Sequence, residues 1–91
     1  MPDCGKILNR AKNSAKSLRF DEVCQLAECF GFVFARQEGS HKTYKRAGFP
    51  RSMTFQNDNG KAKPYQVRQL LLAISQLNEL ESEAEEDYES K

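Results

Sequence analysis

The chain has 91 residues and a formal net charge of +1. This length suits one small domain and excludes two domains of ordinary size. No apolar stretch is long enough to cross a bilayer. The first residues, MPDCGKILNRAKNS, also lack the apolar middle of a signal peptide. We therefore expect a cytoplasmic protein with no membrane partner.

The small net charge hides two regions of opposite sign. Residues 1–78 hold thirteen Lys and Arg against six Asp and Glu, a net charge of +7, whereas residues 79–91 hold seven acids and one Lys, a net charge of −6. We expect residues 1–78 to form a single domain and residues 79–91 to form an acidic, flexible tail. A basic domain suggests an anionic partner, although surface Lys and Arg also serve solubility alone.

Three cysteines, Cys4, Cys24 and Cys29, are odd in number and lack the paired short spacings of a zinc site. Cys24 and Cys29 also lie within an apolar helical pattern. We therefore expect reduced, buried thiols and no metal.

The N-terminal third predicts two helices. Apolar residues of the segment 5–18 fall on one helical face, although Asn13 and Ser14 weaken the pattern of one continuous helix. The segment 20–30 shows helical spacing more clearly, at Phe20, Val23, Cys24 and Ala27. We expect Gly31 to end this helix, because glycine readily adopts the left-handed conformation found just past helix ends.

Three strands are predicted next, at residues 32–37, 41–46 and 52–56, joined by turns at Gly39-Ser40 and at residues 47–51. Residues 57–63, NDNGKAK, predict a polar loop. Strand alternation places Phe32 and Phe34 on one side. It also separates two sets in the second strand: His41, Thr43 and Lys45 on one face, and Lys42, Tyr44 and Arg46 on the other.

Pro64 predicts the first turn of a last helix, whose apolar stripe is Val67, Leu70, Leu71, Ile74 and Leu77. The expected fold is α+β in the order α-α-β-β-β-α, with helices on one face of a three-stranded antiparallel sheet. Phe20, Phe32, Phe34 and Phe55 should pack against the stripe. The other face should be open to solvent, with Tyr44 as its apolar residue. From about Ser82 the chain should be mobile, or extend the last helix by a turn or two.

His41, the only histidine, stands among cations, whereas no P-loop, dinucleotide fingerprint, zinc motif or nucleophile elbow is present. An imidazole can accept the proton of an RNA 2′-OH or protonate the leaving 5′-oxygen, because its ordinary pKa of about 6.5 lies near working pH. Cations would bind phosphate and stabilise developing charge without a metal; the candidates are Lys42, Lys45, Arg46, Arg51, Lys61 and Lys63. The competing interpretation is that His41 is an ordinary exposed residue.

Three stretches, FDEVCQLAECFGF (20–32), GSHKTY (39–44) and GKAKPYQVRQLLLAI (60–74), resemble the HicA toxins, small messenger-RNA-cleaving proteins of bacterial toxin–antitoxin pairs. The resemblance implies a double-stranded-RNA-binding-like fold and a ribosome-independent, metal-independent endoribonuclease without cofactors. It implies that His41 is catalytic, that Gly39 and Ser40 form the turn that positions it, and that a HicB-like antitoxin is the partner. Type members often have a Pro-His element where this chain has TFQNDNG, which leaves no second histidine as partner acid or base.

Two alternatives remain open. A non-catalytic RNA-binding module of the same fold needs no general base, because double-stranded RNA is bound through its shape, 2′-OH groups and phosphates. A protein-interaction domain could instead use the basic surface for an acidic partner. The acidic tail could compete weakly with RNA for that surface, or it could only aid solubility.

Overall fold

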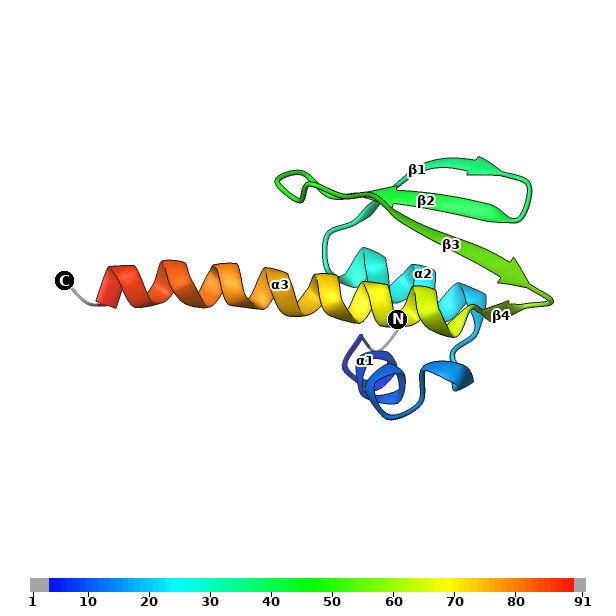
Figure 1. Ribbon diagram of the computed structural model, residues 1–91, viewed down its shortest axis with the longest axis horizontal. Coiled ribbons are helices and arrows are strands. Elements are labelled where there is room, and N and C mark those ends of the chain that lie inside the picture. The colour runs from blue at the N-terminus through cyan, green and yellow to red at the C-terminus, as the bar shows by residue number, and fades with distance from the viewer. Residues whose placement is uncertain (1–3, 90–91) are drawn as a thin grey trace.

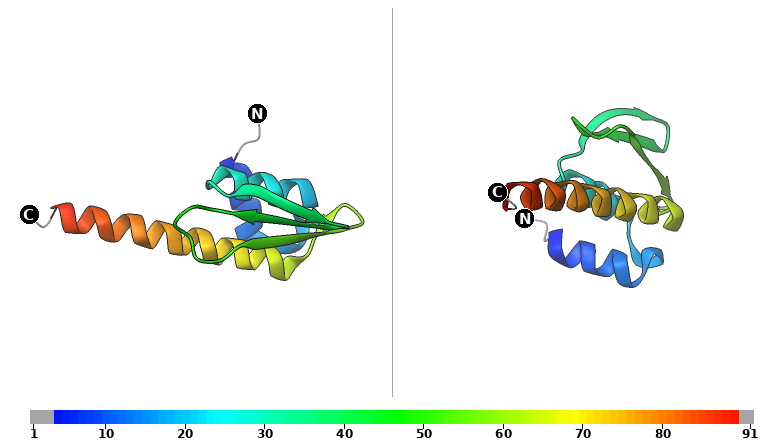
Figure 2. Two further views of the ribbon diagram at one scale, coloured as in Figure 1. Left: turned by 90° about the horizontal axis from the view of Figure 1, so that it is seen from above. Right: turned by 60° about the vertical axis from the view of Figure 1, so that its left-hand side comes forward.

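The computed structural model describes the backbone of residues 4–89 and the side chains of residues 4–77, and it forms three layers (Figure 1). The elements in chain order are α1 (Cys4–Asn13), the 3-10 helix η1 (Ala15–Ser17), α2 (Phe20–Cys29), β1 (Val33–Glu38), β2 (His41–Lys45), β3 (Met53–Asp58), β4 (Lys61–Ala62) and α3 (Pro64–Glu89). The sheet lies on one side, α2 and α3 form the middle layer, and α1 packs beyond them (Figures 1 and 2). The predicted α+β class is confirmed, but the antiparallel sheet has four strands rather than three.

The first predicted helix is interrupted where the sequence weakens. α1 ends at Asn13, and η1 follows as a separate turn. α1 runs antiparallel to α2, so that its Arg10 donates two hydrogen bonds to the Glu22 carboxylate, at 2.7 and 2.6 Å. Ile7 and Ala11 are buried against the helices of the middle layer. α1 is therefore part of the folded domain rather than a loose extension.

The expectation of three reduced thiols is wrong for two of them. Cys4 and Cys29 form a disulfide, with their Cα atoms 6.1 Å apart, because the antiparallel arrangement places the start of α1 beside the end of α2. Spacing in the sequence gives no hint of this proximity. Cys24 is free and buried, as predicted.

Gly31 ends α2 as predicted. Its φ of +88° is left-handed, and the backbone N–H of Phe32 donates to the Ala27 carbonyl while that of Gly31 donates to the Glu28 carbonyl, both at 3.1 Å. These two bonds are the Schellman pattern, which satisfies carbonyls left without helical partners. The chain then turns directly into β1.

Two tight hairpins shape the sheet, whose strand order is β1-β2-β3-β4. Gly39 and Ser40 join β1 to β2, and the positive φ of Gly39 alone, +58°, fits a type II′ turn. Asn59 and Gly60, with φ of +53° and +85°, form a type I′ turn between β3 and β4. Residues 57–63 are therefore a hairpin, and the predicted polar loop is wrong.

The core contains most of the predicted residues, including Phe20, Phe32, Phe55, Val67, Leu70, Ile74 and Leu77, with Leu71 partly buried. Two aromatic predictions are wrong. Phe34 is 52% exposed, because β1 is an edge strand and the helices pack mainly beneath β3 and β4. Tyr44 is only 2% exposed, because its side of β2, shared with the cross-strand pair Met53, faces the helices.

α3 continues to Glu89, so the backbone of the acidic segment extends the last helix, the alternative that the sequence left open. In Figure 1 this part of α3 projects beyond the sheet. The side chains of residues 78–91 lie outside the described residues, and so does the structure of the last two. The flexibility of the segment stays a prediction.

Candidate functional site

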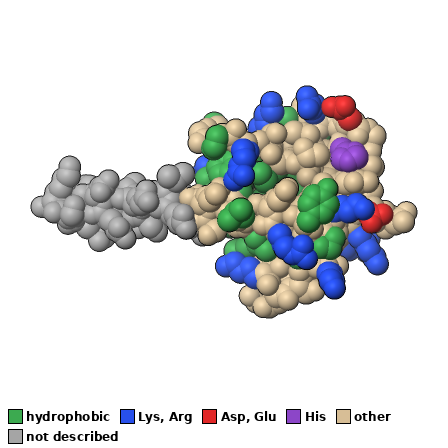
Figure 3. All heavy atoms as spheres, in the orientation of Figure 1, with side chains coloured by type: hydrophobic (Ala, Val, Ile, Leu, Met, Phe, Trp, Pro, Cys, Tyr) green, Lys and Arg blue, Asp and Glu red, His purple; other side chains and the backbone are tan. Residues whose placement is uncertain are grey.

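The type II′ turn presents His41 on the open face of the sheet. His41 begins β2, and its register partners are Glu38 in β1 and Gln56 in β3. We call the side of the sheet away from the helices the outer face; its residues include Val33, Arg36, Glu38, His41, Thr43, Lys45, Thr54 and Gln56. The histidine, purple in Figure 3, is exposed at the surface. From the sequence we expected the opposite side of β2, that of Tyr44, to be open, so the structure reverses which of the two faces meets solvent.

The imidazole is free to meet a ligand. Among residues 4–77, no side chain or backbone group forms a hydrogen bond or ion pair with it. The neighbouring Thr43 and Thr54 hydroxyls bond each other at 3.2 Å. The backbone N–H of Gln56 donates to the Gln66 side chain at 2.7 Å. The surroundings of His41 are therefore held in place while both of its ring nitrogens remain available.

Glu38 is a neighbour of His41 that our sequence analysis missed. The two residues stand directly opposite each other across the Gly39-Ser40 turn, and side chains of such a pair have Cβ atoms about 5 Å apart. The carboxylate also contacts the Arg36 guanidinium at 3.3 Å, an exposed pair that restrains it weakly. The sequence could have predicted this pairing, because a two-residue turn at Gly39-Ser40 places Glu38 and His41 directly opposite each other in the two strands.

The six predicted phosphate-binding cations do not form one cluster. Lys45 shares the outer face with His41, whereas Lys42 lies on the helix-facing side. The Lys42 ammonium lies 5.6 Å from the Phe20 ring centroid and 5.9 Å from that of Phe34. These are cation–π distances. The structure therefore separates Lys42 from His41, as strand alternation predicted.

Arg46 and Arg51 lie at the far end of β2 from His41. The Arg46 side chain rests against Gly31, where a Cβ would come within 2.9 Å of its Nε. The Arg51 guanidinium carbon lies 5.8 Å from the Phe49 ring centroid, and its Nη2 donates to Gln76 at 2.9 Å. Both arginines are thus held by neighbours, and Arg51 adjoins two surface hollows.

Lys61 and Lys63 lie at the other end, next to the β3–β4 turn. Lys61 is the exposed partner of Asp58 in the hairpin. The Lys63 ammonium is 3.5 Å from the Asp58 carboxylate, which partly offsets its charge. The outer face thus has cations near both of its ends, with His41 closer to the Lys61 end.

Two buried titratable groups belong to the core and not to the site. Burial raises the pKa of the Cys24 thiol, and burial together with a hydrogen bond to Cys24 raises the pKa of the Tyr44 hydroxyl far above its ordinary value. Both groups are protonated at neutral pH, so neither supplies a nucleophile or base.

Among residues the structure describes, no cluster of three or more His, Cys, Asp or Glu could hold a metal ion. Nor does any helix in the described part have an apolar stretch able to span a membrane.

Comparison with protein-family models matches residues 20–77 to the HicA toxin of bacterial toxin–antitoxin systems. The match begins at the first residue of α2 and ends in α3, so it spans the sheet and the His41 hairpin but not α1. Comparisons with curated proteins and with solved structures give no match. The family match covers well over half of the chain and confirms the resemblance seen in the sequence. The chain therefore belongs to the HicA toxin family, whose members are generally ribonucleases of toxin–antitoxin pairs.

Proposed function

We propose that this protein is an endoribonuclease that cleaves messenger RNA, with His41 as a general acid or base and the RNA 2′-OH as the nucleophile. The observation that supports this most is the presentation of His41: a tight turn holds the only imidazole on an exposed face, with both ring nitrogens unengaged by residues 4–77. The 2′-oxygen attacks phosphorus and the bond to the 5′-oxygen breaks. The products are a 2′,3′-cyclic phosphate and a 5′-hydroxyl end.

Two proton transfers are needed, and Glu38 is the group we assign to the second. As a carboxylate it accepts the proton of the 2′-OH, while a protonated His41 donates to the leaving 5′-oxygen. Their direct pairing across the turn puts both groups within reach of one phosphodiester. This assignment supplies the partner acid or base for which the sequence offered no second histidine.

Phosphate binding falls to the cations that flank His41 along the outer face. Lys45 lies on that face, and Lys61 and Lys63 lie near the end where His41 begins β2. Arg46 and Arg51 extend the positive region past the other end. Lys42, packed between aromatic rings, is left out of the phosphate site. Charged contacts of this kind supply salt-dependent affinity without sequence preference.

The family implies a cognate antitoxin, and we propose that it is HicB-like and covers the outer face. We also propose that α2, the strands and the first part of α3 form a double-stranded-RNA-binding-like core, and that the protein acts in the cytoplasm.

The test is cleavage of a defined RNA in the presence of EDTA by the wild type and by His41→Ala. Loss of general acid–base catalysis should lower the cleavage rate about a hundredfold or more. Thr43→Ala is the matched control, because Thr43 lies on the same face and transfers no proton. Circular dichroism confirms that each variant is folded.

The products distinguish the mechanisms. Mass spectrometry should find the 2′,3′-cyclic phosphate, and a substrate with a 2′-deoxy sugar at the cleaved position should resist cleavage. A wild type that binds RNA without cutting it would favour the non-catalytic binding module. Cleavage by His41→Ala at the wild-type rate would remove His41 from the reaction.

A further inference from the structure

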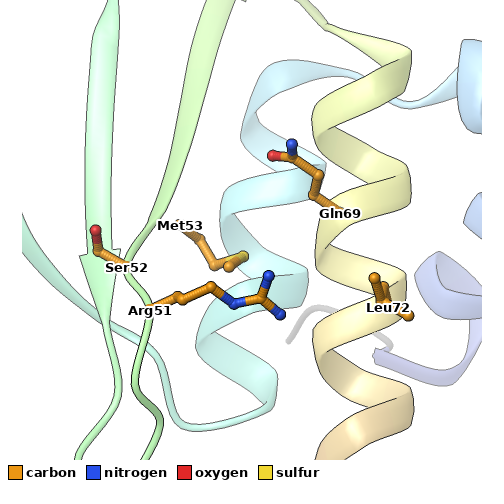
Figure 4. A pocket seen from close by; sticks show the side chains of 5 residues that line it. All are labelled: Arg51, Ser52, Met53, Gln69 and Leu72. Carbon is orange, nitrogen blue, oxygen red and sulfur yellow. The ribbon is translucent and has the colours of Figure 1, made fainter.

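A hollow of about 230 Å³ lies between α3 and the chain that connects β2 to β3 (Figure 4). Its lining residues are Arg51, Ser52, Met53, Gln69 and Leu72. We propose that this hollow binds one base of the RNA strand whose phosphate lies at His41, and that Gln69 selects that base. The inference rests on the proposed function and deepens it by naming residues that set the sequence preference.

Arg51 gives the hollow a fixed cationic wall. Its guanidinium is held between the Phe49 ring, at 5.8 Å, and the Gln76 side chain, at 2.9 Å. Figure 4 shows the side chain reaching from the connection toward α3. A guanidinium fixed in this way offers a flat surface on which a base can stack and a charge for the adjoining phosphate.

The remaining lining groups suit a base better than a phosphate. Met53 is buried, and the Leu72 side chain is 55% exposed beside the hollow, so apolar surface is available for a ring. Within residues 4–77 the Gln69 amide and the Ser52 hydroxyl form no hydrogen bond. A glutamine amide presents an acceptor and a donor side by side, the pattern that pairs with the N6 and N7 edge of adenine.

One RNA strand can reach both the hollow and His41 by crossing the edge of β3. Met53 faces the helices and His41 lies on the outer face, but β4 pairs only with Asn57 and Asp58 of β3, so among the described strands the edge of β3 is open at Met53. Met53 pairs with Tyr44, three residues along β2 from His41, which corresponds to roughly 10 Å at the rise of a β-strand. At the spacing of a stacked strand this distance is roughly three nucleotides. A second hollow of about 300 Å³, lined partly by Lys45 and Arg46, shares Arg51 and Ser52 with the first. Its cations can bind the intervening phosphates.

A partner protein could also place a side chain in this hollow, but the RNA strand is the better occupant. The hollow adjoins the cations of the proposed phosphate path, and Arg51 belongs to both. None of its lining residues is acidic. The experiment below gives the protein partner an outcome of its own.

The test measures binding of four uncleavable ten-nucleotide 2′-O-methyl RNAs, each of a single base, to the wild-type chain by fluorescence anisotropy at fixed salt. We expect oligo(A) to bind about fivefold or more tightly than the others, the effect of one good bidentate contact. Gln69→Ala should reduce this preference to below about twofold. Ser75→Ala, an exposed position of α3 that does not line the hollow, should retain it. Arg51→Ala should weaken binding of all four RNAs.

The outcomes separate the two proposals. If no RNA binds, the proposed function fails and this inference fails with it. If RNA binds without base preference, or with a preference that survives Gln69→Ala, the inference alone is overturned. If Gln69→Ala leaves RNA binding unchanged but weakens binding of the cognate antitoxin, the hollow belongs to the protein partner and the base subsite is overturned.

Discussion

Lys42 and Lys45 are the same residue type in the same five-residue strand, yet they have opposite environments. Lys45 is exposed on the outer face, at the other end of β2 from the free imidazole of His41. Lys42 is half-buried, with its ammonium near the rings of Phe20 and Phe34. The difference arises only from strand alternation, which sends successive side chains to opposite faces of a sheet. A basic segment in the sequence therefore does not mean that each of its cations meets the same ligand.

The two faces also divide the work of the domain. The helix-facing side contributes Tyr44, Met53 and Phe55 to the core, whereas the outer face, apart from Val33, contributes groups that are polar and exposed or bonded only to each other. Substitutions on the first side should change stability, and those on the second should change RNA binding and cleavage. The experiments below test that division and the helix packing on which it rests, beginning with the largest expected effect.

Tyr44→Ala should lower the free energy of unfolding by about 3–5 kcal/mol, the usual cost of removing a large buried aromatic side chain. Tyr44 is 2% exposed and contacts the rings of Phe34 and Phe55, with centroids 6.0 and 5.8 Å away. Urea titration measures the change. The matched control is Lys45→Ala, one residue along on the outer face, which should stay within about 0.5 kcal/mol of wild type. Equal decreases in the free energy of unfolding of the two variants would contradict the division between a stabilising face and a functional face.

Removing the Cys4–Cys29 disulfide should lower the free energy of unfolding by about 3 kcal/mol, because the bond closes a loop with a sequence separation of 25. RNA affinity should not change, since α1 lies in the layer farthest from the outer face. The double variant Cys4→Ser, Cys29→Ser is compared with wild type in urea titrations, with and without a thiol reductant. A reductant should shift the wild-type transition and leave that of the double variant in place. A fall in RNA affinity would show that α1 supports the site.

Lys45→Ala should reduce the slope of log affinity against log salt by about 0.7 for single-stranded RNA, the share of one phosphate contact. Lys42→Ala should leave that slope unchanged and instead cost about 0.5–1 kcal/mol of stability through its lost cation–π contacts. Salt-titrated RNA binding and urea titration of both variants give the comparison. A slope that falls equally in both variants would place Lys42 in the phosphate site after all.

The smallest effect concerns pH and the α1–α2 contact. Hydrogen bonds from Arg10 hold the pKa of Glu22 below its ordinary value of 4.5. The unfolded chain therefore binds more protons than the folded chain in this pH range. The Arg10–Glu22 contact stabilises the fold fully at pH values above the ordinary pKa of Glu22, and this stabilisation is lost as the pH falls through the lowered pKa. Arg10→Gln should flatten the loss of stability below about pH 5. Lys12→Gln removes the same charge from an exposed position of α1 and should keep the wild-type slope.

Much of the fold followed from the sequence because its signals are local. The stripe from Val67 to Leu77, the end of α2 at Gly31 and the Gly39-Ser40 turn all depend on neighbours within a few residues. The Asn59-Gly60 hairpin could also have been predicted, because Asn-Gly is the preferred pair of a type I′ turn. The separation of His41 from Lys42 and Tyr44 on opposite faces of β2 was correct for the same local reason.

The wrong predictions concern contacts between distant segments. The Cys4–Cys29 bond depends on how α1 packs on α2. The environments of Phe34 and Tyr44 depend on which strands the helices cover, because both residues lie on the helix-facing side but only Tyr44 lies under the helices. Alternation separates the two faces correctly, yet it cannot say which one is buried. The hollow beside Gln69 likewise forms only when α3 lies along β3.

One irregularity of the sheet bears on how the protein behaves at high concentration. β1 is an edge strand, exposed at all of its positions, and Val33 and Phe34 are apolar and exposed there. A regular edge of this composition would be a template for strand-to-strand assembly with another copy. The register shift between Phe34 and Arg36 leaves Ala35 outside the pairing, and such a bulge bends and twists the strand away from regular pairing. Together with the charges of Arg36 and Glu38, it disfavours strand pairing between two copies along this edge.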